Sequence, residues 1–182
     1  MRDAVAAIRL FVCVQLGQGD DVLREFLAVA ALVYLSFVGP ASAEVRALLV
    51  GVSDYDDSTG ISDLRGPVND VLLLKDVLEK RGATDIVIVA DGVVGSRRPT
   101  LTSIVSGFAE FSWRAKSGDV VSVHLSGLGT RHQDLEGDET DGLDEVFLPA
   151  DVKRASDGIT IPNALTDDRF GELVLAIRET GA

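Results

Sequence analysis

The sequence predicts an α/β fold, a three-layer sandwich in which a mainly parallel sheet is covered by helices on both faces. Short, almost continuous apolar runs alternate with longer segments whose apolar residues recur every three or four positions. This alternation is typical of buried parallel strands joined by crossover helices. The chain has 182 residues, 46% of them hydrophobic. That is enough for one good core, so we expect a single globular domain.

The first predicted strand runs from Val45 to Val52 and ends in a polar loop. The next segment predicts a helix, because Pro67 suits a first helical turn and Gly82 suits a helix end. Between them lies a wide apolar stripe, formed by Val68, Val71, Leu74 and Leu78.

Residues 86–90 form the second predicted strand, which Asp91-Gly92 ends with turn chemistry. Thr100 can cap the following helix, and residues 120–125 form the third strand. The last helix begins near Thr166. A helix with its apolar stripe normally delivers another strand, so we expect the chain to be a fragment that lacks its C-terminal strands, the alternative being an edge left open.

Residues 1–43 are typical of a signal peptide or N-terminal apolar leader. The apolar segment from Phe26 to Val38 is preceded by Arg24 and followed by an Ala-x-Ala ending at Ala43, the order of a secretory signal. We therefore expect an exported protein, periplasmic or secreted, whose remaining domain, residues 44–182, has no thiol, because Cys13 is the only cysteine. The alternative is a membrane-associated N-terminal helical pair, since Ala4 to Leu16 is also apolar.

The net charge of -12 argues against nucleic acid as a partner, because phosphate binding needs clustered lysine and arginine. No basic stripe is present in the sequence. Basic or divalent cationic partners are favoured instead.

The turn after the third predicted strand, Ser126-Gly127-Leu128-Gly129, is expected at the carboxyl edge of the sheet, where open α/β folds place their ligands. Its middle position, where a catalytic acid or base would be expected, is Leu128. His124 lies within the strand, and we expect a hydrogen-bonded core residue there. His132 lies beyond the turn and is expected in a solvated loop.

Two familiar kinds of site are not supported. A nucleophile elbow needs Gly-x-Ser-x-Gly, but His124 stands at the first glycine position before Ser126. The sequence also contains no phosphate-binding glycine loop of the Walker or dinucleotide type.

An acid-rich segment lies between Asp134 and Asp151, interrupted by Gly137 and Gly142. Oxygen ligands at close spacing on a flexible loop suit Ca²⁺, although the spacing is not that of an EF-hand. The alternative is a solvated acidic loop. The acids are Asp134, Glu136, Asp138, Glu139, Asp141, Asp144, Glu145 and Asp151.

Five segments together resemble the caspase and metacaspase-like superfamily of cysteine peptidases, in its bacterial branch, and they cover the chain from Val45 onwards. The resemblance implies a caspase-like fold. The segments are Arg46-Ala47-Leu48-Leu49-Val50-Gly51-Val52, Leu64-Arg65-Gly66-Pro67-Val68-Asn69-Asp70-Val71, Pro99-Thr100, His124-Leu125-Ser126-Gly127-Leu128-Gly129, and Gly137-Asp138-Glu139-Thr140-Asp141-Gly142-Leu143-Asp144-Glu145.

The resemblance also implies roles for single positions. In that family the Ser-Gly-x-Gly turn holds the histidine that activates a cysteine on the following strand, and Leu128 stands in its place. The cysteine would follow Ala182. Gly129 matches a residue whose backbone N–H resembles an oxyanion donor.

Asp70 and Ser126 match positions that help form a pocket for a basic side chain, although Pro67 departs from a cysteine often found there. For Asp70 the alternative is an ordinary first-turn acid favoured by the helix dipole. Asp138, Asp141 and Asp144 match the segment associated with calcium dependence, so the resemblance implies that they are ligands.

Two functional hypotheses follow. The first is a caspase-like cysteine endopeptidase domain that is inactive as it stands, a pseudo-peptidase or a fragment, because both halves of the dyad are missing. The second is a module that binds calcium, or a peptide or protein segment with basic residues, without cutting it. Contact with a membrane is expected only through an uncleaved leader.

Overall fold

A computed structural model describes residues 43–156 and 158–182. Ala43 to Ala182 form one compact unit. The predicted leader, residues 1–43, lies outside the described residues except for Ala43. Among the described residues, each helix is too short or too polar to cross a membrane.

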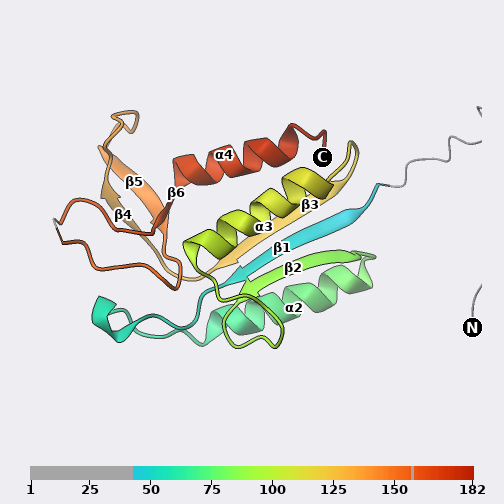
Figure 1. The fold of residues 1–182 in the computed structure, drawn as a ribbon, viewed down its shortest axis with the longest axis horizontal. Coiled ribbons are helices and arrows are strands. Elements are labelled where there is room, and N and C mark those ends of the chain that lie inside the picture. Colours follow the sequence, from blue (N-terminus) through green and yellow to red (C-terminus); the bar gives the residue numbers. More distant parts are fainter. Residues whose placement is uncertain (1–42, 157) are drawn as a thin grey trace, which may run out of the picture. The chain divides into compact units, whose positions relative to one another are not determined.

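The central element is a parallel sheet with the strand order β2-β1-β3. It consists of β1 (Val45–Gly51), β2 (Asp85–Ala90) and β3 (Val120–Ser126), and β1 pairs in parallel with both neighbours (Figure 1). The three strands are the three that the sequence predicts. β1 is buried almost throughout because its apolar side chains face packed layers on both sides.

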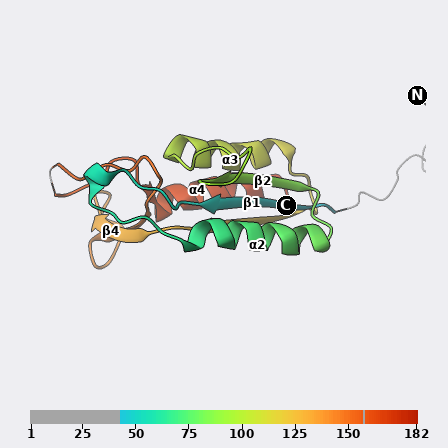
Figure 2. The same cartoon turned by 90° about the horizontal axis from the view of Figure 1, so that it is seen from below.

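Helices cover both faces of this sheet, so the predicted three-layer α/β sandwich is confirmed. α2 (Gly66–Lys80) lies on one face and α3 (Leu101–Arg114) on the other, with α4 (Asp167–Arg178) beside α3 (Figure 2). Side chains alternate along β1, so Leu48 and Val50 enter the core under α3 and α4, whereas Leu49 packs on α2.

The helix boundaries follow the predicted signals. Pro67 lies in the first turn of α2, and Gly82 follows its end with a φ of 91°. Thr100 caps α3 by accepting a hydrogen bond from the Ser103 N–H, and Thr166 caps α4 in the same way from Arg169. These signals are local, which is why the sequence is sufficient to place them.

A second, antiparallel sheet with the order β4-β5-β6 lies beyond the carboxyl end of β3 (Figure 1). It contains β4 (Gly129–Gln133), β5 (Leu143–Phe147) and β6 (Leu165–Thr166), and a short 3-10 helix, η1 (Asp57–Thr59), follows β1. These elements are not predicted from the sequence. β4 is mostly exposed and polar, and acidic residues dilute the apolar pattern of β5, so neither shows a clear strand period.

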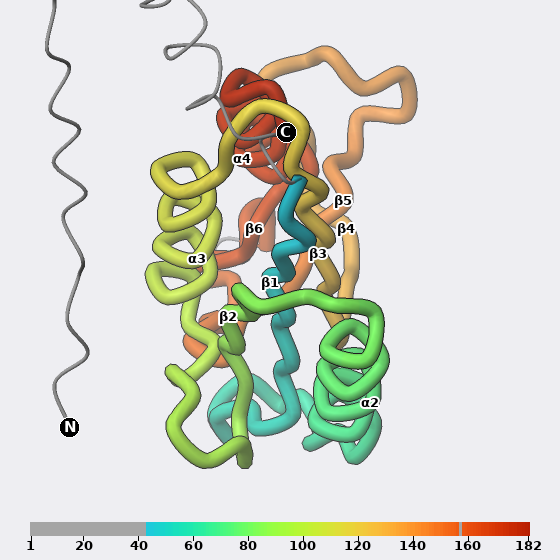
Figure 3. Tube along the Cα trace, turned by 90° about the vertical axis from the view of Figure 1, so that its right-hand side faces the viewer, coloured from blue at the N-terminus to red at the C-terminus, as the bar shows by residue number. Residues whose placement is uncertain are grey.

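β3 is the edge strand of the parallel sheet (Figure 3). Its residues are half-buried or exposed, in contrast to the buried residues of β1. No strand within the described ranges pairs with its outer edge.

Candidate functional site

The Ser126–Gly129 turn lies at the carboxyl end of β3, as predicted, and leads directly into β4. Packing restricts which residues fit in the middle of this turn. A Cβ atom at Gly127 would lie 2.9 Å from the Phe147 ring and 3.2 Å from the Val52 Cβ. Only glycine lets the turn pass this closely over the core.

Leu128 is held by both of its backbone polar groups. Its N–H donates to the Tyr55 hydroxyl at 3.1 Å, and its carbonyl accepts from the Leu148 N–H at 2.9 Å. The Tyr55 hydroxyl in turn donates to the Leu148 carbonyl, and burial raises the pKa of this phenol, so it remains a proton donor at neutral pH. The Leu128 side chain packs against the main core, so this position offers a hydrocarbon and no titratable group.

Tyr55 is not predicted from the sequence as a residue of this site. It lies in the loop after β1, and its contact with Leu128 joins residues 73 positions apart. No local pattern marks such a long-range contact.

Gly129 begins β4 opposite Phe147. Because the Leu148 N–H bonds to the Leu128 carbonyl, Gly129 and Phe147 form a non-hydrogen-bonded pair, in which the N–H points away from the partner strand. The Gly129 N–H, a backbone donor beside Leu128, therefore takes no part in the hydrogen bonds between β4 and β5.

Asp70 and Ser126 are brought together, as the sequence analysis expected of two residues in one pocket. The Ser126 hydroxyl donates to the Asp70 carboxylate at 2.6 Å. Asp70 is the fifth residue of α2 and lies beyond its first turn, so the alternative of an ordinary first-turn acid is wrong. Its carboxylate is open to solvent and retains acceptor positions for a cationic group.

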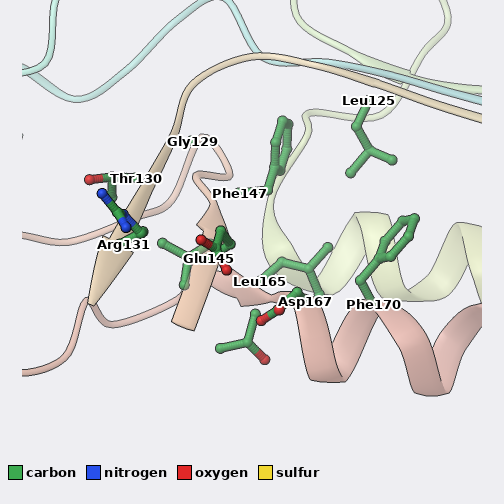
Figure 4. Close-up of a pocket in the computed structure, with 11 residues that line it drawn as sticks. Leu125, Gly129, Thr130, Arg131, Glu145, Phe147, Leu165, Asp167 and Phe170 are labelled. Atoms are coloured by element: carbon green, nitrogen blue, oxygen red, sulfur yellow. The ribbon is translucent and has the colours of Figure 1, made fainter. Parts of the chain in front are cut away.

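A cavity of about 570 Å³ lies between the end of β3, the antiparallel sheet and the start of α4 (Figure 4). The apolar side chains Leu125, Phe147 and Phe170 gather at one end of it, and Arg131 lies towards the other. Further lining residues are Gly129, Thr130, Glu145, Val146, Leu165, Thr166 and Asp167. An apolar floor with carboxylates at its rim suits a long side chain with an aliphatic stem and a positive head.

The structure changes the expectations for both histidines. The Nε2 atom of His124 is buried and has no hydrogen-bond partner in the described part of the chain, so the predicted hydrogen-bonded role is wrong for this atom. Ser126 reaches α2, and alternation therefore points His124 towards the same helix. The residues of α2 that pack there, such as Val71 and Leu74, are apolar and supply no partner.

His132 is not in a solvated loop, because β4 holds it and its side chain is 10% exposed. Its Nδ1 accepts from the Ile161 N–H at 3.3 Å, which places the ring proton on Nε2 in the neutral form. Nε2 lies 3.2 Å from the Asp144 carboxylate. His132 therefore ties the acidic segment to the chain before β6.

Asp134 organises the acidic segment. Its carboxylate accepts hydrogen bonds from the backbone N–H groups of Glu136, Gly137 and Glu139 at 2.7 to 3.0 Å. These bonds, with the one from Gly137 the largest cause, lower the pKa of Asp134. They occupy three of the roughly four acceptor positions of this carboxylate, so Asp134 retains one position for another ligand.

Ligand atoms of Asp134, Asp138 and Asp144 lie within 4.8 Å of one another. Asp138 and Asp144 are thus brought together as the resemblance implied. Asp141 is not in this group, because its carboxylate contacts Arg131 at 3.5 Å and accepts from the Leu143 N–H. Asp134 is the third member of this group, although its position in the sequence did not distinguish it from the neighbouring acids.

The start of α4 adds negative charge to the same region. Repulsion from Asp138 is the largest cause that raises the pKa of Asp168. Burial, followed by repulsion from Asp167 and Asp138, raises the pKa of Glu139. Two segments distant in sequence therefore build one crowded anionic surface.

The parallel sheet, its two helical layers and the carboxyl-end turn define a caspase-like α/β domain. A solved structure with a similar fold is that of the protein GSU0716 from Geobacter sulfurreducens, with a TM-score of 0.57 and 20% identity over 73% of this chain and 45% of that chain.

The sequence comparisons specify the family. Residues 45–179 match the model of the metacaspase, peptidase C14 domain, and the chain belongs to this family. Metacaspase-7 of Arabidopsis thaliana is 36% identical over 138 residues, which are 74% of this chain and 31% of the relative. Metacaspase-1 of Schizosaccharomyces pombe is 29% identical over 71% of this chain and 29% of its own length. The chain thus spans about a third of these relatives.

Proposed function

We propose that this chain is a metacaspase-type domain that binds peptides through a basic side chain and does not hydrolyse them. The observation that carries the proposal is Leu128, which occupies the position that corresponds to the histidine of the dyad in the family it resembles. The backbone around Leu128 is fixed by Tyr55 and Leu148, and its side chain is a hydrocarbon.

The chemical consequence concerns proton transfer. Peptide cleavage by a cysteine needs a thiolate and a group that protonates the leaving amine. A leucine side chain neither accepts nor donates a proton. His132 does not replace the missing base, because both of its ring nitrogens already face partners, the Ile161 N–H and the Asp144 carboxylate.

Binding is supported by groups that do not depend on position 128. Asp70 is exposed and bonded to Ser126, which leaves its charge available for a lysine or arginine. Glu145 and Asp167 line the cavity between the end of β3 and the start of α4, together with a single basic residue, Arg131. The net charge of -12 attracts a basic peptide at long range.

The test has a cleavage arm and a binding arm, both with the same fluorescent arginine peptide. We expect no release of product, even at high enzyme concentration and with calcium present. Fluorescence polarisation should show binding that weakens about fivefold in Asp70→Asn, whereas Asp76→Asn on the distant outer face of α2 should leave it unchanged. Turnover that co-purifies with the chain would overturn the inactive assignment, and equal affinity for the matching citrulline peptide would overturn the binding assignment.

A second candidate function, calcium binding, is favoured by the Asp134, Asp138 and Asp144 group. Two oxygens on one Ca²⁺ ion lie at most about 5 Å apart, because each bond is 2.3 to 2.6 Å long. The 4.8 Å separation of these ligand atoms satisfies that limit, and carboxylate oxygen is the donor that Ca²⁺ prefers. A bound ion would offset the repulsion among the acids of this surface.

Titration calorimetry of the chain with CaCl₂ at constant ionic strength tests this second proposal. We expect Asp138→Asn to weaken binding at least about tenfold, because Asp138 is exposed and free to coordinate. Glu179→Gln, which removes an exposed acid at the far end of α4, is the matched control. An absence of heat at millimolar calcium, or equal losses in both variants, would contradict calcium binding at this group.

A further inference from the structure

A polar cavity of about 380 Å³ lies at the carboxyl end of the parallel sheet, separate from the residues around Leu128. Three segments form its walls. Asp56 and Ser58 come from the loop after β1, Arg98 precedes α3, and residues 150–154 follow β5. The cavity is therefore built by the connections that leave the sheet, which is where folds of this class bind ligands.

The cavity collects positive charge on a strongly acidic protein. Arg98, Lys153 and Arg154 all line it, and none of them forms an ion pair with another described residue, although the chain carries 29 acidic residues. Three cations at one cavity that form no ion pair in the described part of the chain are the arrangement that would receive an anion.

The two acids in the wall are engaged by donors of their own chain. Asp151 accepts from the Leu101 N–H at 2.8 Å and from the Asn163 side chain at 3.3 Å. Asp56 accepts from the Ser58 N–H at 2.8 Å. Hydrogen bonds from Ser58 and, to a smaller extent, the charge of Arg98 lower the pKa of Asp56. Both carboxylates thus accept bonds from local donors, and neither forms an ion pair with the cations of the wall.

Arg98 is the anchored member of the set. Its guanidinium donates to the Ala150 carbonyl at 3.3 Å, which holds the head group over the cavity while other N–H donors remain. A planar guanidinium matches a carboxylate with two parallel hydrogen bonds. Lys153 and Arg154 are exposed and line the same cavity, so they can add charge.

We propose that this cavity is a second subsite, which receives the carboxylate of a glutamate or aspartate in the bound peptide. The inference rests on the proposed peptide binding and adds an acidic residue to the basic one held at Asp70. A single carboxylate is favoured over a polyanion, because the net charge of -12 repels an extended chain of phosphates.

The experiment uses labelled peptides in sets of four that combine arginine or citrulline at one position with glutamate or glutamine at another. The spacing between the two positions is varied from two to six residues, and polarisation gives each affinity. At the best spacing we expect glutamate to bind about fivefold more tightly than glutamine. Arg98→Gln, and separately the double variant Lys153→Gln with Arg154→Gln, should reduce this preference to about onefold.

Arg81→Gln is the control, because Arg81 is also exposed and without an ion pair but lies at the end of α2. The double variant breaks no hydrogen bond described for those side chains, so it tests the proposal if Arg98→Gln disturbs the fold. Equal affinity for glutamate and glutamine at every spacing, or an equal loss in Arg81→Gln, overturns the subsite. If the glutamate preference is absent but arginine is still preferred over citrulline, the subsite fails and the proposed function stands. If neither preference is seen, the proposed function fails as well.

Discussion

The two ends of the parallel sheet carry many charged groups but compensate them differently. At the amino end, Arg46 at the start of β1 is 7% exposed and is surrounded by carboxylates of Glu44, Asp85 and Asp119. Asp119 also accepts hydrogen bonds from the backbone N–H groups of Glu44 and Lys116. These charges are paired within the chain, and the network joins the starts of β1, β2 and β3.

At the carboxyl end the charges lack such compensation. Asp70 is exposed, and in the described part of the chain its side chain bonds to the Ser126 hydroxyl alone. Repulsion from Asp138 raises the pKa of Asp168. The difference is consistent with the proposed function, in which the amino end contributes stability and a ligand neutralises charge at the carboxyl end.

Arg46→Met should have the largest effect, because it removes the cation and leaves three acids together at a buried site. Breaking one side of a buried pair costs about 3 kcal/mol or more, so the free energy of unfolding in urea should fall by about that amount. Arg81→Met, at an exposed position, should change it by less than about 0.5 kcal/mol. Similar values for the two variants would mean that the amino-end network is not a source of stability.

Gly127→Ala should be the most damaging change at the carboxyl end. The new methyl group would lie 2.9 Å from the Phe147 ring, and overpacking of this kind costs about 2 kcal/mol. Gly171→Ala in α4 is the matched control, since no atom lies within 4 Å of its added Cβ. That variant should be stabilised by about 0.5 kcal/mol, because alanine is the better helix former.

The two ends should also respond in opposite directions to acid. Hydrogen bonds, first from the Glu44 N–H and then from Arg46, lower the pKa of Asp119 from 3.8 to about 2. The contribution of Asp119 is therefore complete above about pH 4 and is lost as the pH falls towards 2. Asp168 has a raised pKa, so its ionised form destabilises the fold, and stability is gained as the pH falls through that raised value.

Urea unfolding at a series of pH values in EDTA measures both effects. Asp119→Asn should be less stable than the parent at pH 6 and should lose less stability between pH 4 and 2. Asp168→Asn should be at least as stable as the parent at pH 6 and should lack the gain that the parent shows on acidification. Parallel pH profiles for the parent and both variants would contradict the contrast between the two ends.

The sequence predicted the parts of the fold that depend on local signals. Pro67, Thr100 and Thr166 mark helix starts because each acts within one turn of its own position. The three buried strands are visible because helices cover both of their faces. β4 could not be predicted, since its polar residues Gly129 to Gln133 are fixed by pairing with β5 rather than by an apolar pattern.

The candidate site was predicted in part for the same reason. The turn around Leu128 and the pairing of Asp70 with Ser126 follow from motifs in the sequence. The support of Leu128 by Tyr55 requires the folded chain. The acidic group contains Asp134 in place of the predicted Asp141, whose carboxylate contacts Arg131. This contact also requires the folded chain.

Ser126→Ala should have the smallest effect on stability and so gives the sharpest test of the contrast. The hydroxyl bonds to an exposed carboxylate, so its loss should change the free energy of unfolding by less than about 0.5 kcal/mol. The same change frees the Asp70 side chain to move. The affinity for an arginine peptide, measured by fluorescence polarisation, should therefore fall about threefold. Ser112→Ala on α3, which bonds only to its own helix, should leave the affinity unchanged. A large loss of stability in Ser126→Ala with unaltered affinity would place Ser126 among the structural residues, because a group that serves a ligand is expected to affect binding more than folding.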